Sequence, residues 1–137
     1  MRTKYYKSFK YFLLINTNYC NKFITFAKMR TIYRSMEFDL FYNSLSNKIQ
    51  NKIDYALNII SEMKIINSKL AKKLKNTNLY ELRITTENEY RVIFFTIDHE
   101  NLIESKEIIL LNGFVKKSTK DYKKEIHKAQ QILNTLI

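Results

Sequence analysis

The sequence predicts an α+β fold in which helices pack against an antiparallel sheet. Apolar residues recur at helical spacing before residue 61 and again after residue 121, and three β-rich segments lie between these regions. Short polar connections join the β-rich segments, as in a meander. A helix must bury its apolar stripe, so helices before and after a meander give one sheet with helices packed on it. The length of 137 residues suits a single domain.

The first elements are a strand and helices. Residues 30–34 alternate in polarity and predict a short edge strand, and residues 37–44 carry apolar side chains at helical spacing. Ser46 is a favourable N-cap for a second helix. Residues 68–75 (SKLAKKLK) predict one or two further helical turns. The apolar stripe of the second helix consists of Ile49, Ile53, Ala56, Leu57 and Ile60.

Three strands are predicted next. Residues 79–85 and 90–97 are rich in β-forming side chains and flank the polar connection 86–89, which indicates a hairpin. Residues 106–111 form the third predicted strand. Gly113, the only glycine of the chain, is expected to break this strand.

The last helix is amphipathic. Ser118 and Asp121 resemble a capping box at its start. Its predicted buried face consists of Tyr122, Ile126, Ala129, Leu133 and Leu136. Its opposite face carries a lysine stripe at spacing i, i+4 and i+8, formed by Lys120, Lys124 and Lys128.

The N-terminal residues differ from the rest. Residues 1–28 hold eight of the 19 aromatic residues and show no clean period of a helix or strand. Their apolar run ends at Asn16 without a cleavage site, so neither a signal peptide nor a membrane span is expected. We expect a poorly structured extension, with the functional domain at residues 29–137. The alternative is a helix of residues 9–13 that docks on the sheet or on a membrane surface.

The net charge of +11 is unevenly distributed. Residues 1–28 hold six of the 24 basic residues and none of the 13 acids, which leaves +5 for residues 29–137. A local basic cluster near the C-terminus indicates binding to a phosphate backbone, and a solvated helix face is the alternative. The single cysteine, Cys20, fits a reducing cytoplasm. The cluster comprises Lys116, Lys117, Lys120, Lys123, Lys124 and Lys128.

Arginine and lysine are the candidate site residues. Arg83 and Arg91 lie in neighbouring predicted strands, and Lys116 and Lys117 follow the third. Neighbouring strands bring such residues onto one sheet face when their parity agrees. Guanidinium and ammonium groups bind phosphate oxygens and stabilise charge that develops on them.

Each candidate also has a purely structural alternative. Arg83 can pair with Glu81 or Glu89, Arg91 can cap a sheet edge, and the lysine stripe can serve solubility. Other chemistries find little support, since His99 and His127 are expected at the surface and no nucleophile elbow occurs. One glycine excludes a glycine-rich phosphate loop. No Cys/His or compact Asp/Glu set is present, so no metal and no cofactor is expected.

Four motifs follow one another in a fixed order: LYELR at residues 79–83, YRVIFF at 90–95, ILLNGFVKK at 109–117 and KKEI at 123–126. Together they resemble the phage-derived HigB branch of the RelE/ParE toxin superfamily. The segment 41–53 is similar to the same branch. The resemblance covers roughly residues 30–130 and leaves the first 28 residues without a counterpart.

The resemblance implies a RelE-like microbial RNase fold and cleavage of mRNA, usually on the ribosome. It also implies a cytoplasmic protein with a helix-turn-helix antitoxin as its partner and no membrane. By the same resemblance, Arg83, Arg91, Lys116 and Lys117 bind and polarise the scissile phosphate. Tyr122 is either catalytic or a packing residue, and both roles stay open. The chain has Asn112 where the family often has histidine, which removes a histidine base at that point.

These observations predict the toxin of a type II toxin–antitoxin system, a metal-independent endoribonuclease that inhibits translation. Arg83, Arg91, Lys117 and Tyr122 are the predicted catalytic residues. Two alternatives stay open: a ParE-like gyrase poison without RNase activity, and a decayed toxin that only binds its antitoxin. The predicted RNA-binding residues are Lys116, Lys120, Lys124 and Lys128.

Overall fold

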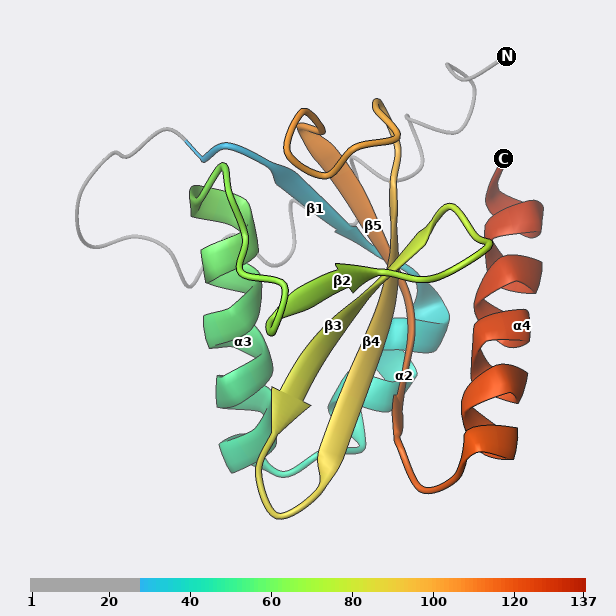
Figure 1. The fold of residues 1–137 in the computed structure, drawn as a ribbon. Helices are drawn as coiled ribbons and strands as arrows, with labels where there is room; N and C mark the ends of the chain where they lie inside the picture. Colours follow the sequence, from blue (N-terminus) through green and yellow to red (C-terminus); the bar gives the residue numbers. More distant parts are fainter. Residues whose placement is uncertain (1–27) are drawn as a thin grey trace.

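The computed structural model describes residues 28–137, which form a five-stranded sheet with helices on both faces (Figure 1). The predicted α+β fold is therefore confirmed. The expected extension lies outside the described residues, apart from Lys28. The elements are β1 (Thr31–Arg34), α2 (Met36–Asn43), α3 (Asn47–Glu62), β2 (Ala71–Lys73), β3 (Leu79–Thr85), β4 (Glu89–Thr96), β5 (Glu107–Val115) and α4 (Thr119–Leu136).

The strands lie in the order β1-β5-β4-β3-β2, which places β4 at the centre of the sheet. β2, β3, β4 and β5 pair with one another in antiparallel fashion, and the antiparallel arrangement of β3, β4 and β5 was predicted. β1 runs parallel to β5, with Thr31 opposite Glu107 and Arg34 opposite Leu110. A parallel pair needs a long connection between its strands, and here the intervening helices and strands provide it. The sequence predicts the edge position of β1 but not its direction.

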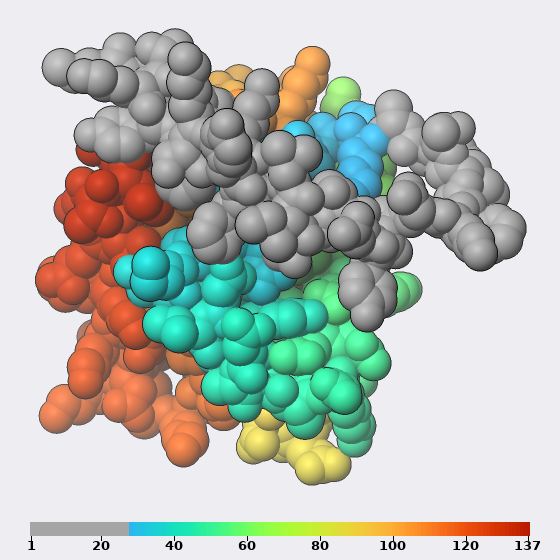
Figure 2. Space-filling model, turned by 180° about the vertical axis from the view of Figure 1, so that it is seen from behind, coloured from blue at the N-terminus to red at the C-terminus, as the bar shows by residue number. Residues whose placement is uncertain are grey.

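Two apolar cores hold the layers together. α2 and α3 cover one face of the sheet, where they are seen from outside in Figure 2, and α4 covers the other face. Full burial of one large apolar side chain contributes about 1.5–3 kcal/mol. The first core includes Phe38, Ile53, Ile60, Leu82 and Phe94, and the second includes Ile93, Leu111, Ala129 and Leu133.

The helix predictions are largely confirmed. All five residues of the predicted α3 stripe are buried, and the five predicted apolar residues of α4 pack into the second core. Ile132 is also buried on α4, which the prediction omits. The Ser118 hydroxyl accepts from the backbone N–H of Asp121, whereas Ser46 occupies the N-cap of α3 without a side-chain cap. No helix within residues 28–137 has the length and apolar character that a membrane span requires.

Two predictions about strands are wrong. Residues 68–75 do not form helical turns as a whole, because residues 71–73 are strand β2, in which Ala71 pairs with Leu82 of β3. Such a short mixed segment fits either structure locally, and the free edge of β3 selects the strand. The third strand does not end before Gly113, since β5 runs unbroken from Glu107 to Val115.

Arg30 ties three parts of the fold together. Its guanidinium is buried and donates to the backbone carbonyls of Ile60, Met63 and Lys64 at the end of α3. It also donates to the carbonyl of Leu102 in the β4–β5 connection. The last carbonyls of a helix lack partners within the helix and favour a nearby positive charge. Arg30, which directly precedes β1, therefore caps the end of α3.

Candidate active site

The candidate site lies on the α4 side of the sheet, where β3 and β5 end and β4 and α4 begin (Figure 1). Arg83 is near the end of β3 and Arg91 near the start of β4, and the two residues are direct partners in the register. Lys116 follows β5 immediately, and Tyr122 lies in the first turn of α4. The hairpin and the β5–α4 connection thus bring four predicted site residues to one end of the molecule.

Glu81 neutralises the two arginines. Like charges directly opposite one another on neighbouring strands repel, so Arg83 and Arg91 need a nearby carboxylate. Glu81 lies one pleat before Arg83 on the same face, and its Oε1 is 2.7 Å from Nε and 2.6 Å from Nη2 of Arg83. Its Oε2 is 3.8 Å from Nε of Arg91. Arg91 also contacts Glu89, with Nη2 at 3.1 Å from Oε2.

Tyr122 is bound to the same carboxylate. Its hydroxyl donates to Oε2 of Glu81 at 2.5 Å, and its ring lies 5.9 Å from the ring of Phe114. Nζ of Lys116 is 5.5 Å from the centre of the tyrosine ring. Burial raises the pKa of Tyr122, and the hydrogen bond to Glu81 and its negative charge raise it further, against the opposing effect of the two arginines. The phenol therefore stays protonated at neutral pH.

The side chains of the site range from almost completely buried to partly exposed, and the exposed ones form an open rim. The side chain of Glu81 is 2% exposed and that of Arg91 7% exposed, whereas Arg83 is 34% and Lys116 40% exposed. Arg83 and Lys116 can therefore contact an anion that arrives from solvent, and Arg91 adds positive charge from the buried side. Such an arrangement of cations can bind a phosphodiester and stabilise negative charge on it.

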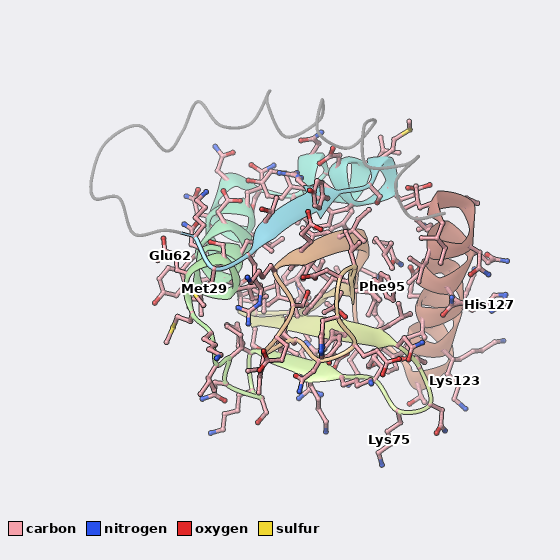
Figure 3. The ribbon with its side chains drawn as sticks, turned by 90° about the horizontal axis from the view of Figure 1, so that it is seen from above. Met29, Glu62, Lys75, Phe95, Lys123 and His127 are labelled. Carbon is pink, nitrogen blue, oxygen red and sulfur yellow. The ribbon has the colours of Figure 1, made fainter. Side chains whose placement is uncertain are left out.

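The remaining predicted residues lie outside this cluster of contacts. Lys117 is exposed directly after Lys116, and Lys120, Lys124 and Lys128 are exposed along α4. Figure 3 shows the neighbouring Lys123 and His127 on the side of α4 that faces away from the sheet. The lysine stripe thus forms a separate surface that begins near the site and continues along the helix.

The structure also tests the structural alternatives for the arginines. The alternative pairing of Arg83 with Glu81 is present, whereas the alternative that Arg91 caps a sheet edge is wrong, because β4 is the central strand. Asn112 is 1% exposed, and its side-chain amide donates to the backbone carbonyl and Oε2 of Glu125 on α4. Position 112 is thus buried and links β5 to α4.

Glu81 is the functional candidate that sequence reasoning missed. From the sequence, Glu81 was predicted only as a possible ion-pair partner of Arg83. The sequence nevertheless marks Glu81 as unusual. It shares the strand parity of Leu79 and Arg83, and it is an acid in an otherwise mostly apolar, buried strand. No group of three or more His, Cys, Asp or Glu side chains suited to a metal ion occurs among residues 28–137.

The comparisons with known proteins match this chain to one family and one fold. The sequence profile of the phage-derived protein Gp49-like family (DUF891) matches residues 41–134. The structure is similar to a mutant of E. coli toxin RelE in the free state, in which two arginines are replaced by alanine. The TM-score is 0.54 with 13% sequence identity, and the match covers 73% of this chain and 97% of RelE.

A second similar structure is a chain of the intact E. coli RelBE toxin–antitoxin complex. The TM-score is 0.50 with 13% identity, over 65% of this chain and 99% of the other. No curated protein sequence matches this chain. At this level of identity the structural likeness shows a shared RelE fold.

Proposed function

The chain belongs to the phage-derived Gp49-like family, and from this premise we propose that it is the toxin of a toxin–antitoxin pair and cleaves messenger RNA. The observation that carries the proposal is the convergence of Arg83, Arg91, Lys116 and Tyr122 around the buried Glu81. The shared fold with toxin RelE supports it. A site built from cations suits a phosphodiester substrate better than a neutral one.

The proposed reaction is attack of an RNA 2′-hydroxyl on the adjacent phosphate. Arg83 and Lys116 bind the phosphate oxygens from the open rim, and Arg91 adds positive charge from the buried side. These groups stabilise the additional negative charge of the transition state. Lys117 lies next to Lys116 and strengthens binding of the neighbouring backbone. The reaction as proposed requires no metal ion.

The substrate and partners follow from the same proposal. The lysine stripe of Lys120, Lys124 and Lys128 binds the RNA backbone beyond the cleaved phosphate. A cognate antitoxin neutralises the toxin, and the RelBE toxin–antitoxin complex is a precedent for an antitoxin partner on this fold. We propose that this antitoxin is of the helix-turn-helix class. We further propose that the protein acts in the cytoplasm on mRNA bound to the ribosome.

Transcript mapping after induction tests the function. Expression of the wild-type protein is expected to arrest growth and to create discrete new 5′ ends within transcripts. Arg91→Ala is expected to abolish both effects while the protein still binds its antitoxin. Growth arrest without new transcript ends would contradict RNA cleavage and favour a gyrase poison. Absence of growth arrest by a folded wild-type protein would favour a decayed toxin that only binds antitoxin.

A further inference from the structure

Tyr122 and Glu81 form a phenol–carboxylate pair inside the candidate site. The Tyr122 hydroxyl donates to Oε2 of Glu81 at 2.5 Å, and Glu81 is almost completely buried. A hydroxyl has one hydrogen to donate and two positions that accept. Because this hydrogen is committed to Glu81, the Tyr122 oxygen presents only acceptor positions to any further group that reaches it.

We propose that this pair is the proton acceptor of the cleavage reaction, an inference that rests on the proposed function. The 2′-hydroxyl transfers its proton to Oη of Tyr122 while the phenol proton passes to Oε2 of Glu81. The 2′-oxygen forms a bond to phosphorus, and the bond from phosphorus to the 5′-oxygen breaks. The departing oxygen takes a proton from solvent, and Glu81 later returns its proton to solvent. The products are a 2′,3′-cyclic phosphate and a 5′-hydroxyl.

Tyr122 alone cannot serve as this base. Burial and the neighbouring carboxylate raise its pKa, so no tyrosinate is available at neutral pH. A neutral phenol accepts a proton readily only if its own proton leaves in the same step. Glu81 supplies the acceptor for that proton at hydrogen-bond distance. Glu81 is thus a positioning residue that acts on the substrate through Tyr122.

Substrate binding couples the arginines to this pair. In the free protein Arg83 contacts Oε1 of Glu81 through two nitrogens, and Arg91 lies near Oε2. These contacts hold the Glu81 carboxylate in place while no substrate is bound. A phosphate at the open rim competes for the same guanidinium groups. As Arg83 turns towards the phosphate, it gives up its contact with Oε1 of Glu81, and the carboxylate keeps its contacts with Arg91 and Tyr122.

Charged groups from several elements surround the Tyr122–Glu81 pair. They come from three strands or their ends and from α4. These groups are Arg83 on β3, Arg91 and Glu89 on β4, Lys116 after β5 and Glu125 on α4.

The test compares Glu81→Gln, Tyr122→Phe and the double variant. Each protein is mixed with one defined mRNA, alone and bound to ribosomes, and cleavage is followed under single-turnover conditions from acidic to mildly alkaline pH. Glutamine still accepts a hydrogen bond but cannot take the proton, and phenylalanine lacks the relay oxygen. Each single substitution is expected to slow cleavage about 100-fold. The double variant is expected to be no slower than the single variants, because both remove one unit.

The pH profile separates this role from a structural one. Protonation of Glu81 removes the acceptor, so the wild-type rate is expected to fall towards acidic pH, and this fall is absent from both single variants. Tyr42→Phe is the matched control, since the Tyr42 hydroxyl contacts both Asp54 oxygens at 2.9 and 2.8 Å on the opposite sheet face. It removes an equivalent phenol–carboxylate pair and is expected to keep the wild-type rate and profile.

The outcomes are distinguishable. If the wild-type protein cleaves no RNA, the proposed function fails and the inference fails with it. If the wild type cleaves RNA and a folded Glu81→Gln or Tyr122→Phe protein keeps its rate and pH profile, only the inference is overturned. Multiplicative losses in the double variant also overturn it. Glu81→Gln removes the charged partner of the arginines and can fail to fold for that reason. In that case the rate and pH profile of Tyr122→Phe test the inference, since this variant retains Glu81 and both arginines.

Discussion

Gly113 shows how a single residue without a side chain positions a whole layer. A Cβ at this position would lie 2.1 Å from Cδ1 of Phe41, far inside van der Waals contact. The absence of a side chain on β5 therefore lets α2 approach the strand closely. The backbone of Gly113 stays in the strand, so the residue is required by close packing and not by a turn.

Gly113→Ala is expected to destabilise the protein by about 1–3 kcal/mol, because the new methyl group forces α2 away from β5. Chemical denaturation of the two proteins measures this difference. In a Phe41→Ala background the same substitution is expected to cost much less, since the ring that it meets is gone. Equal costs in both backgrounds would show that the contact with Phe41 does not limit this position.

At the scale of the elements, helix α4 has two separate roles, one for each of its faces. Its inward face packs Ala129, Ile132 and Leu133 onto the sheet and presents Tyr122 to Glu81. Its outward lysines contact solvent. At a rise of 1.5 Å per residue, Lys120 and Lys128 lie about 12 Å apart along the helix, which is the length of a few nucleotides. The helix can therefore position the site and bind RNA at the same time.

Replacing Lys120, Lys124 and Lys128 together by alanine is expected to weaken RNA binding. Each lost phosphate contact lowers the slope of log K against log salt concentration by about 0.7 for a single strand, so the slope falls by about 2. Titration with a short single-stranded RNA at several salt concentrations measures it. The matched control replaces the exposed Lys52, Lys64 and Lys69. An equal fall in this control would indicate a general charge effect.

At the scale of the whole molecule, Arg30 connects the segment before β1 to two distant parts of the chain. Lys28 and Met29 are exposed, whereas Arg30 is 2% exposed and hydrogen-bonds to four backbone carbonyls. These carbonyls come from the end of α3 and from the β4–β5 connection. Arg30 thus joins segments that lie 30 to 72 residues away in the sequence.

A chain that begins at Met29 is expected to keep the thermal midpoint and the growth arrest of the full chain. A chain that begins at Thr31, or the full chain with Arg30→Ala, is expected to lose at least about 3 kcal/mol, because several buried carbonyls lose their donor. Thermal unfolding of the three proteins measures the difference. If the chain from Met29 is insoluble, or folds without arresting growth, residues 1–28 are part of the functional protein.

The sequence by itself determined the features that depend on local periodicity. The α3 stripe, the β3–β4 hairpin and the start of α4 at Ser118 are confirmed because each is encoded by neighbouring residues. The sequence predicted that Arg83 and Arg91 share a face only if the parity of their strands agrees, and the register of the β3–β4 hairpin places them directly opposite one another. The motifs also pointed to the family.

Only the tertiary structure decided which groups bind the buried polar side chains. It also decided which segments become strands by pairing with a neighbouring strand. Tyr122 and Glu81 are 41 residues apart, and Arg30 and Leu102 are 72 apart, so no local pattern reveals these contacts. β2 exists because β3 offers an open edge, and β5 continues through Gly113 because this residue and Phe114 pair with β4. Local propensities were nearly balanced in these segments, and contacts with distant parts of the chain selected one structure.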